Sequence, residues 1–369
     1  MGKQRNHIYE VHYIRAIASL MVLLVHVSAA YYYQHDQKYN EITLFINQIS
    51  RFGTPMFAVI SGFLLFYQTI IKGFYFKRFV SSRFTKIGIP FFLWSGFYLS
   101  FMILAQNIQP FEEGYLVFLI NFAFGDSFYH LYFMSIVFQF YLIFPLLQLI
   151  RSKKSWILLL FLAALTNLYI LKFYAPGQTE GILKVLLSQR AFLPSWIFFF
   201  IFGGFLAYNW EGLIKFSQKN KIVLGLSVLI LTALAVLEYK IIGSVPSNRA
   251  TNLVNIPIIT LFILGISEDI MKIRFLNRFL TKVGTLSMAI YLVHPFVLYI
   301  VQTIAPQFIW KTTLFPITFM IVLALTIAVV KLIQLLPYNQ YILTVPKIKE
   351  SQKNHWKPQT TIKVSNTTN

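Results

Sequence analysis

Long apolar stretches recur along the whole chain and constrain its fold more than any other feature. A helix needs roughly 20 mainly apolar residues to cross the hydrocarbon core of a bilayer. Ten stretches meet this requirement, near residues 13–33, 50–71, 87–106, 129–150, 155–172, 192–210, 221–242, 252–268, 284–305 and 313–336. The composition agrees, because charged residues make up 12% of the chain, against about 25% in a typical soluble domain. We therefore predict an all-α fold, a polytopic transmembrane helical bundle of about ten spans.

The distribution of basic residues predicts how this bundle is oriented. The chain has 32 Lys and Arg residues and 12 Asp and Glu residues, and cytoplasmic loops of membrane proteins carry an excess of Lys and Arg. If the N-terminus is cytoplasmic, 22 basic residues fall on the cytoplasmic side and 7 on the opposite side, and the other three, Arg15, Arg51 and Lys331, lie in or at the edges of spans. We therefore predict that both termini are cytoplasmic. Because topology accounts for the positive charge, we expect the lipid bilayer as a partner and no nucleic acid.

The domain organisation follows from the same pattern. Residues 7–336 are predicted to form one transmembrane domain, and residues 337–369 a polar, basic cytoplasmic tail. The chain has no cysteine, which excludes disulfides, a thiol nucleophile and thiolate zinc sites. We expect no metal.

Two ionisable residues lie inside the first apolar stretch. Arg15 and His26 are separated by ten residues, so their side chains lie about 20° apart around a helix and roughly 16 Å apart along it. An ionisable side chain in hydrocarbon costs about 2.5–3.5 kcal/mol on insertion scales and is therefore a candidate for function. We expect both side chains to point into one cavity, although a snorkelling arginine and a packed histidine would give the same spacing.

The second apolar stretch begins with Arg51 and contains Ser61 and Gly62. Arg51 lies at the predicted outer boundary, where the positive-inside rule does not favour a cation, so it could hold an anionic group. Small residues at mid-membrane usually allow close packing of helices. We therefore interpret Ser61 and Gly62 first as a packing site.

A cluster of cations precedes the third apolar stretch. It contains Arg78, Arg83 and Lys86, and the last two are three residues apart and share a helix face. These residues could anchor the cytoplasmic boundary, or they could clamp a phosphate group. The sequence leaves both interpretations open.

Histidines are the other polar residues at membrane depth. His130 lies at the start of the fourth apolar stretch, and His294 lies in the middle of the ninth, directly before Pro295. None of the 12 acidic residues is central in a predicted span. Imidazole exchanges protons near neutral pH, so the candidates for proton transfer are histidines.

Six short motifs occur along the chain in a fixed order. They are Arg15-x10-His26, Ser61-Gly62-Phe63, Arg83-x-x-Lys86, His130-Leu-Tyr-Phe, Phe202-Gly203-Gly204 and Tyr291-Leu-Val-His294-Pro295. Together with the ten spans, they resemble the acyltransferase 3 family, whose members are multi-span membrane acyltransferases that modify surface glycans. The resemblance covers about residues 7–336. The family's cytoplasmic pair is Arg-x-x-Arg, and Lys86 keeps its charge but not its bidentate geometry.

One branch of this family is especially similar. The segments Glu10-Val-His-Tyr-Ile-Arg15 and Arg51-Phe-Gly-Thr-Pro resemble the intercellular adhesion protein C branch of Gram-positive bacteria. Members of that branch have been described both as exporters of poly-N-acetylglucosamine and as O-succinyltransferases. The resemblance implies a multi-pass protein of the bacterial plasma membrane.

The resemblance also implies substrates and residue roles. The donor would be a cytoplasmic acyl-CoA, acetyl-CoA or succinyl-CoA, and the acceptor a hydroxyl of a cell-surface polysaccharide. Catalysis would rest on His26 and Arg15, with His26 as general base or transient acyl carrier. The donor phosphates would bind Arg78, Arg83 and Lys86. Acceptor or oxyanion contacts would come from Arg51, Ser61, His130 and His294.

Two alternatives to a membrane O-acyltransferase stay open. The chain could export or flip a poly-N-acetylglucosamine-type glycan, since its 38 Phe, 21 Tyr and 6 Trp residues suit sugar stacking as well as lipid contact. It could also be a non-catalytic membrane partner of a glycan synthase. Glycan synthase proteins are expected partners under each interpretation.

Overall fold

The computed structural model describes residues 9–150, 152–173 and 180–345, and every regular element in these residues is a helix. In chain order the α-helices are α1 (Tyr9–Gln34), α2 (Glu41–Ser50), α3 (Gly53–Lys72), α4 (Phe76–Arg83), α5 (Ile89–Gln106), α6 (Tyr115–Ala123), α7 (Tyr132–Leu147), α8 (Lys153–Phe173), α9 (Gly181–Leu187), α10 (Ile197–Tyr208), α11 (Trp210–Lys219), α12 (Lys221–Ile242), α13 (Asn252–Gly265), α14 (Ser267–Lys272), α15 (Arg274–Ile304), α16 (Phe315–Gln334) and α17 (Asn339–Leu343). A π-helical turn, Phe84–Gly88, joins α4 to α5, and 3-10 turns occupy Leu193–Ser195, Gln307–Trp310 and Thr312–Leu314.

The helices confirm an all-α membrane bundle. Within the described residues, seven helical segments are long and apolar enough to cross a membrane, or eight if α10 and α11, which meet at 92°, form one broken span. The two remaining predicted stretches correspond to shorter apolar helices, α7 with 16 residues and α13 with 14. The count of ten spans and the cytoplasmic termini remain predictions.

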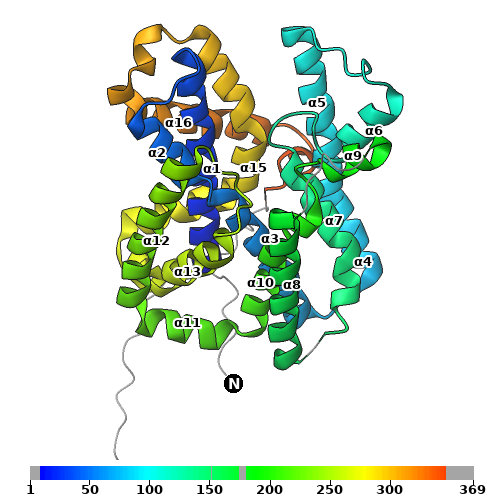
Figure 1. Cartoon of the computed structure of the whole chain (residues 1–369), viewed down its shortest axis with the longest axis vertical. Coiled ribbons are helices and arrows are strands. Elements are labelled where there is room, and N and C mark those ends of the chain that lie inside the picture. The colour runs from blue at the N-terminus through cyan, green and yellow to red at the C-terminus, as the bar shows by residue number, and fades with distance from the viewer. Residues whose placement is uncertain (1–8, 151, 174–179, 346–369) are drawn as a thin grey trace, which may run out of the picture.

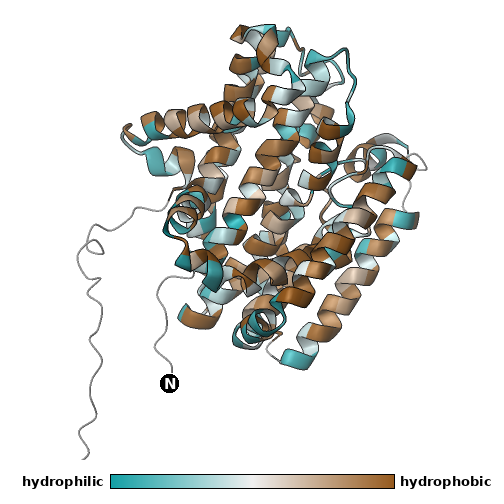
Figure 2. Cartoon of the chain, turned by 90° about the vertical axis from the view of Figure 1, so that its left-hand side faces the viewer, coloured by the Kyte–Doolittle hydropathy of each residue, from teal (hydrophilic) through white to brown (hydrophobic). Residues whose placement is uncertain are grey.

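Hydropathy follows the helices as it does in a membrane protein. Figure 2 shows apolar residues along the helix bodies and hydrophilic residues at helix ends and in connecting loops. In Figure 1, α11 lies across one end of the bundle. Few of the residues in the apolar parts of α8 and α12 are buried, whereas most of the residues in the apolar part of α15 are. Such exposed apolar helices can face lipid, and α15 belongs to the core.

Two helix pairs cross at very short range because glycine removes the side chain. A Cβ atom on Gly62 of α3 would lie 2.2 Å from the carbonyl oxygen of Phe200, and one on Gly203 of α10 would lie 2.1 Å from the carbonyl oxygen of Val59. The packing interpretation of Gly62 is therefore confirmed. Helices α1 and α15 cross in the same way, since a Cβ atom on Gly284 would lie 2.2 Å from the carbonyl oxygen of His12.

The predicted tail, residues 337–369, is helical in its first part. Helix α17 packs on the bundle: the indole Nε1 of Trp94 on α5 donates a 3.0 Å hydrogen bond to the carbonyl of Ile342, and Leu343 is fully buried. The tail therefore begins with a docked helix. Residues 346–369 lie outside the described residues.

Candidate functional site

Several of the predicted site residues surround one cavity at the C-terminal end of α1. We call it the histidine cavity, and its volume is about 460 Å³. The residues that line it include His26, Tyr39, Arg51, Tyr129, His130, Tyr132, Arg190 and Tyr291. The cavity thus combines imidazole and guanidinium groups with a wall of tyrosines. The structure brings three of the predicted site residues, His26, Arg51 and His130, to this one cavity.

His26 is half-buried and stands between two other rings. Its ring centroid lies 4.8 Å from that of Tyr129 and 5.1 Å from that of His294. His26 lies on α1, which packs along α15, so the close α1–α15 crossing brings His26 and His294 together. Tyr129 adds a phenol to the same face. Its position directly before His130 is the one signal in the sequence that could have identified it.

His294 is buried, and a backbone contact fixes its tautomer. Its Nδ1 atom lies 2.9 Å from the carbonyl oxygen of Ile290, one turn earlier on α15. Because a carbonyl oxygen can only accept, Nδ1 donates and carries the hydrogen in neutral imidazole. Nε2 is then the acceptor, and it has no hydrogen-bond partner among the described residues.

His130 reaches the same place from the turn before α7. The hydroxyl of Tyr291 donates to the carbonyl oxygen of His130, which ties this turn to α15. The His130 ring is buried, and its centroid lies 5.8 Å from that of His294 and 5.0 Å from that of Tyr98. Both ring nitrogens lack a partner in the part of the chain that the structure describes. Three imidazoles from distant parts of the sequence therefore converge with unused hydrogen-bonding atoms.

Arg51 is positioned by an asparagine that the sequence analysis did not select. Nε and Nη2 of Arg51 donate to Oδ1 of Asn47 at 3.1 and 3.0 Å. The Asn47 amide nitrogen donates in turn to the carbonyl of Val25 and to the hydroxyl of Ser28 on α1. No carboxylate lies within ion-pair distance of Arg51 among the described residues. The i, i+4 spacing of Asn47 and Arg51 on one helix is the signal that could have revealed this pair.

Tyr39, between α1 and α2, completes this side of the cavity. Burial raises the pKa of its phenol above the ordinary value, and the Arg51 guanidinium partly offsets the effect. Tyr39 is therefore a neutral hydrogen-bonding group at neutral pH.

Arg15 does not line the histidine cavity, which corrects the expectation of one cavity shared with His26. Its Nε atom donates a 3.1 Å hydrogen bond to the hydroxyl of Ser287 on α15. Ser61 does not line this cavity either, although it stands on α3 beside the packed Gly62. Arg15 does not reach the histidine cavity because α1 and α15 pack closely, and the guanidinium is hydrogen-bonded to Ser287 in this contact.

The predicted phosphate clamp forms a separate, small groove of about 170 Å³, which we call the arginine groove. Its cationic lining residues are Lys72, Arg78, Arg83 and Lys86. Arg83 is partly engaged there: its Nη2 atom donates to Oε1 of Gln68 at 2.9 Å, and its guanidinium lies 5.9 and 5.8 Å from the ring centroids of Phe79 and Tyr141. The structure brings the three predicted clamp residues together, and their role stays a prediction.

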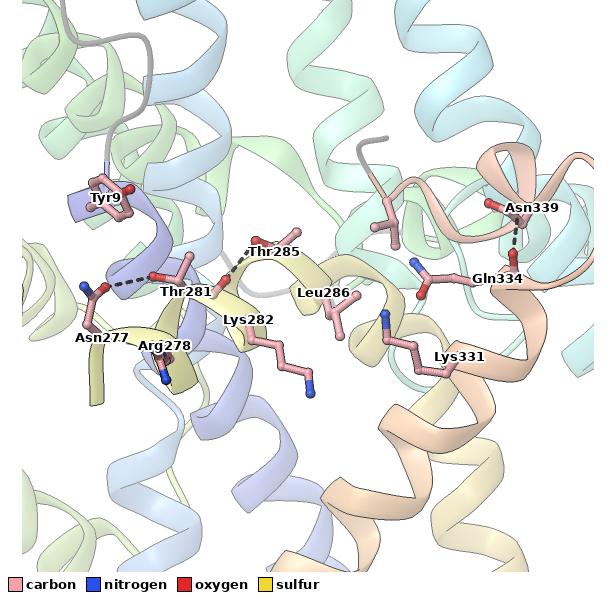
Figure 3. A pocket seen from close by; sticks show the side chains of 11 residues that line it. Tyr9, Asn277, Arg278, Thr281, Lys282, Thr285, Leu286, Lys331, Gln334 and Asn339 are labelled. Carbon is pink, nitrogen blue, oxygen red and sulfur yellow. Dashed lines mark hydrogen bonds between the residues drawn. The ribbon is translucent and has the colours of Figure 1, made fainter. Parts of the chain in front are cut away.

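A larger cavity of about 750 Å³ lies at the opposite end of α1, and we call it the basic cavity. It is lined by Tyr9, Asn277, Arg278, Thr281, Lys282, Thr285, Leu286, Lys331, Gln334, Asn339 and Val345. Lys282 on α15 and Lys331 on α16 extend toward one another across it (Figure 3). The sequence analysis missed this cavity, because it assigned Arg278 and Lys282 to topology and Lys331 to the edge of a span.

Arg15 lies between the two cavities. Along α1, Tyr9 lines the basic cavity and His26 lines the histidine cavity, with Arg15 between them. Along α15, Leu286 lines the basic cavity and Tyr291 lines the histidine cavity, and Ser287 lies between these two residues. The Arg15–Ser287 hydrogen bond therefore lies, along both helices, between the residues that line the two cavities.

Histidine, aspartate and glutamate side chains do not form a metal site in the described residues, since no group of three or more has the required arrangement. The chemistry available at the histidine cavity is proton transfer by imidazole and hydrogen bonding by phenol and guanidinium groups.

Comparisons with known proteins agree with this architecture. The acyltransferase domain of the acyltransferase 3 family matches residues 8–333. A protein of Staphylococcus aureus strain Mu50 is 26% identical over 310 residues, which cover 78% of this chain and 82% of that protein. A protein of Staphylococcus epidermidis is 25% identical over 304 residues, which cover 78% and 81%.

Each of these relatives is named a probable poly-beta-1,6-N-acetyl-D-glucosamine export protein. No solved structure matches this chain. The family match covers nearly all of the predicted domain, residues 7–336, and confirms the resemblance that the motifs indicated. The chain belongs to the acyltransferase 3 family and is a multi-pass bacterial membrane protein with an acyltransferase domain.

Proposed function

We propose that the chain transfers an acyl group, acetyl or succinyl, from acyl-CoA to a hydroxyl of a cell-surface polysaccharide, with His26 as the general base. The observation that carries the proposal is the pair of cavities at opposite ends of α1. One is basic and suits a phosphate-bearing donor, and the other holds imidazoles among tyrosines and suits a sugar hydroxyl. A polysaccharide precursor and glycan synthase proteins are the proposed partners in the plasma membrane.

The proposed step needs one base and no metal. The acceptor hydroxyl donates its proton to a ring nitrogen of His26 as its oxygen attacks the thioester carbonyl. The C–O bond forms and the C–S bond breaks, so that the ester and the thiolate of coenzyme A are the products. His26 then returns the proton to the thiolate. A second path, in which His26 carries the acyl group transiently, uses the same position.

His294 and His130 are proposed to orient His26 and the acceptor. The fixed tautomer of His294 leaves Nε2 as an acceptor 5.1 Å, ring to ring, from His26. An N–H on the far side of His26 can donate to it directly or through a water, which aims the basic nitrogen into the cavity. His130, with two unpartnered nitrogens, supplies further contacts to the acceptor or to the oxyanion.

The proposal also gives roles to the other predicted site residues, which are Arg15, Arg51, Ser61 and the residues of the arginine groove. Arg15 guides the thioester between the cavities, and Arg51 holds the acceptor or the acyl carboxylate. Ser61 retains the acceptor-contact role that the family resemblance implies, although it does not line the histidine cavity. The same resemblance implies the arginine groove, with Arg78, Arg83 and Lys86, as the alternative place for the donor phosphates.

Export of a poly-N-acetylglucosamine-type glycan is the alternative, and the names of the relatives favour it. A purified-protein assay separates the two functions. The full chain in lipid nanodiscs is incubated with poly-N-acetylglucosamine and either acetyl-CoA or succinyl-CoA, and ester on the glycan is measured by mass spectrometry. Donor-dependent ester, absent without protein, is the expected result. If neither donor yields ester while cells lacking the protein fail to place glycan on their surface, export replaces acyl transfer.

Arg51 gives a test of the acyl group. If the group is succinyl, Arg51→Gln is expected to lower kcat/KM with succinyl-CoA by about 10–100-fold, because a hydrogen bond to a charged carboxylate is lost. The rate with acetyl-CoA should change little. Lys38→Gln is the matched control, since Lys38 is exposed and lies outside the histidine cavity. An equal loss with both donors would assign Arg51 to the acceptor and not to the acyl group.

A further inference from the structure

We infer that the basic cavity binds the phosphate-bearing nucleotide end of the acyl donor, and that the arginine groove does not. This inference rests on the proposed function and names the part of the protein that receives its donor. It differs from the family resemblance, which points to Arg83 and Lys86.

The charges in the basic cavity are all of one sign. Arg278 and Lys282 stand one turn apart on α15, and Lys331 approaches from α16 (Figure 3). Within the described part of the chain, none of the three makes an ion pair or a hydrogen bond, and no carboxylate lines the cavity. Cations held together without a counter-charge raise the local potential and attract a polyanion. Phosphate groups bound here would satisfy all three.

Neutral polar groups on the same walls suit the rest of a nucleotide. Oδ1 of Asn277 accepts hydrogen bonds from the hydroxyls of Tyr13 at 2.9 Å and Thr281 at 3.1 Å. The amide nitrogen of Asn277 is therefore left as a donor without a partner in the described part of the chain. Gln334 adds a second amide from α16. Amides can pair with the edges of a base or with ribose hydroxyls.

Size separates the two basic sites. Pockets for molecules of nucleotide size usually have about 300–1,000 Å³. The basic cavity has about 750 Å³, whereas the arginine groove has about 170 Å³. Arg83 is moreover held by Gln68 inside the groove. The groove can accept a phosphate group but not the nucleotide that carries it.

The basic cavity also lies near the histidine cavity along α15. Leu286 lines it, and Tyr291, five residues later on α15, lines the histidine cavity, which is about 7.5 Å along a helix. The long, uncharged pantetheine arm of coenzyme A can cross this distance past Arg15. The described contacts do not place the arginine groove on this route, because its residues come from α3, α4, the π-helical turn and α7.

Coenzyme A itself is the probe for the test. The full chain is placed in phosphatidylcholine nanodiscs, and binding is titrated calorimetrically. Lys282→Gln and Lys331→Gln are each expected to weaken coenzyme A binding about 10-fold or more, since each removes a charge-assisted contact. Arg83→Gln and Lys86→Gln should leave the affinity within about threefold. Lys215→Gln, at an exposed position on α11, controls for net charge, and unchanged unfolding midpoints confirm that the variants fold.

Two results would overturn the inference. In the first, Lys282→Gln and Lys331→Gln bind coenzyme A as tightly as the unmodified protein, while Arg83→Gln and Lys86→Gln bind it weakly. This result would place the phosphates in the arginine groove. The second concerns an anionic lipid, whose headgroup carries the same phosphate chemistry. If native mass spectrometry in phosphatidylglycerol nanodiscs shows lipid adducts that Lys282→Gln removes, while coenzyme A affinity is unchanged, the basic cavity is a lipid site.

The binding readout is independent of acyl transfer, so the two proposals can fail separately. Lysine-dependent coenzyme A binding without ester on the glycan would retain this inference and refute the proposed function. Ester formation with unchanged coenzyme A affinity in both lysine variants would retain the function and refute the inference.

Discussion

Replacing His26 with glutamine is expected to lower the rate of acyl transfer by about 10²–10⁴-fold, the usual contribution of a general base. The amide fills a similar space and can hydrogen-bond, but it cannot take the proton of the acceptor hydroxyl. The loss should appear in kcat, while coenzyme A binding should stay close to that of the unmodified protein, because the basic cavity is at the other end of α1. Single-turnover transfer to the glycan, read by mass spectrometry, measures the effect.

His35→Gln is the matched control for this variant. His35 lies just beyond α1, is exposed and does not line the histidine cavity. Its replacement should leave transfer unchanged. Transfer in His26→Gln within about threefold of the unmodified rate would remove the imidazole from the chemistry. In cells, His26→Gln should abolish surface ester while glycan still reaches the surface. Loss of surface glycan with unchanged ester per chain would support export.

Replacing Gly203 with leucine is expected to prevent stable packing of the bundle. A Cβ atom at this position would lie 2.1 Å from the Val59 carbonyl oxygen and 2.6 Å from the backbone nitrogen of Phe63. Neither backbone atom can move without separating α3 from α10. Overpacking of a core costs about 1–3 kcal/mol and occasionally more, and we expect this site to exceed that range. The unfolding midpoint and the monodisperse yield in detergent measure the loss.

Gly96→Leu provides the comparison for Gly203→Leu. Gly96 also lies in an apolar helix, α5, but a Cβ atom there meets no atom within 4 Å. The same change in side-chain size should therefore be tolerated, and replacing glycine can even favour the helix. Equal midpoints for the two variants would contradict the close-contact explanation.

The sequence predicted the architecture well, because the membrane imposes a simple rule on it. Apolar stretches of sufficient length must be helical in hydrocarbon, so the long apolar helices followed from the hydropathy pattern. Gly62 was correctly interpreted as a packing residue, because small residues at mid-membrane allow close packing of helices. Its partner on α10 could not be predicted, since the pairing of α3 with α10 depends on tertiary structure.

The site was predictable where its members share a helix or a motif, and not where they meet across helices. His26, Arg51 and His130 were selected as ionisable residues within or at the ends of apolar stretches, and they line one cavity. The helical spacing placed Arg15 on the same face of α1 as His26, but it could not predict that the Arg15 side chain hydrogen-bonds to Ser287 on α15. The basic cavity escaped notice because positive charge at a cytoplasmic boundary already had an explanation, and because Lys282 and Lys331 meet only once α15 and α16 pack together.

The position of Arg15 between the two cavities has a further consequence for the cell. An arginine keeps its positive charge across the physiological pH range, and a fixed cation in a narrow passage repels protons and other cations. We therefore expect the guanidinium of Arg15, tethered to Ser287, to oppose the passage of cations between the two cavities. Under the proposed function, donor and acceptor could then meet in one protein while the transmembrane potential is preserved.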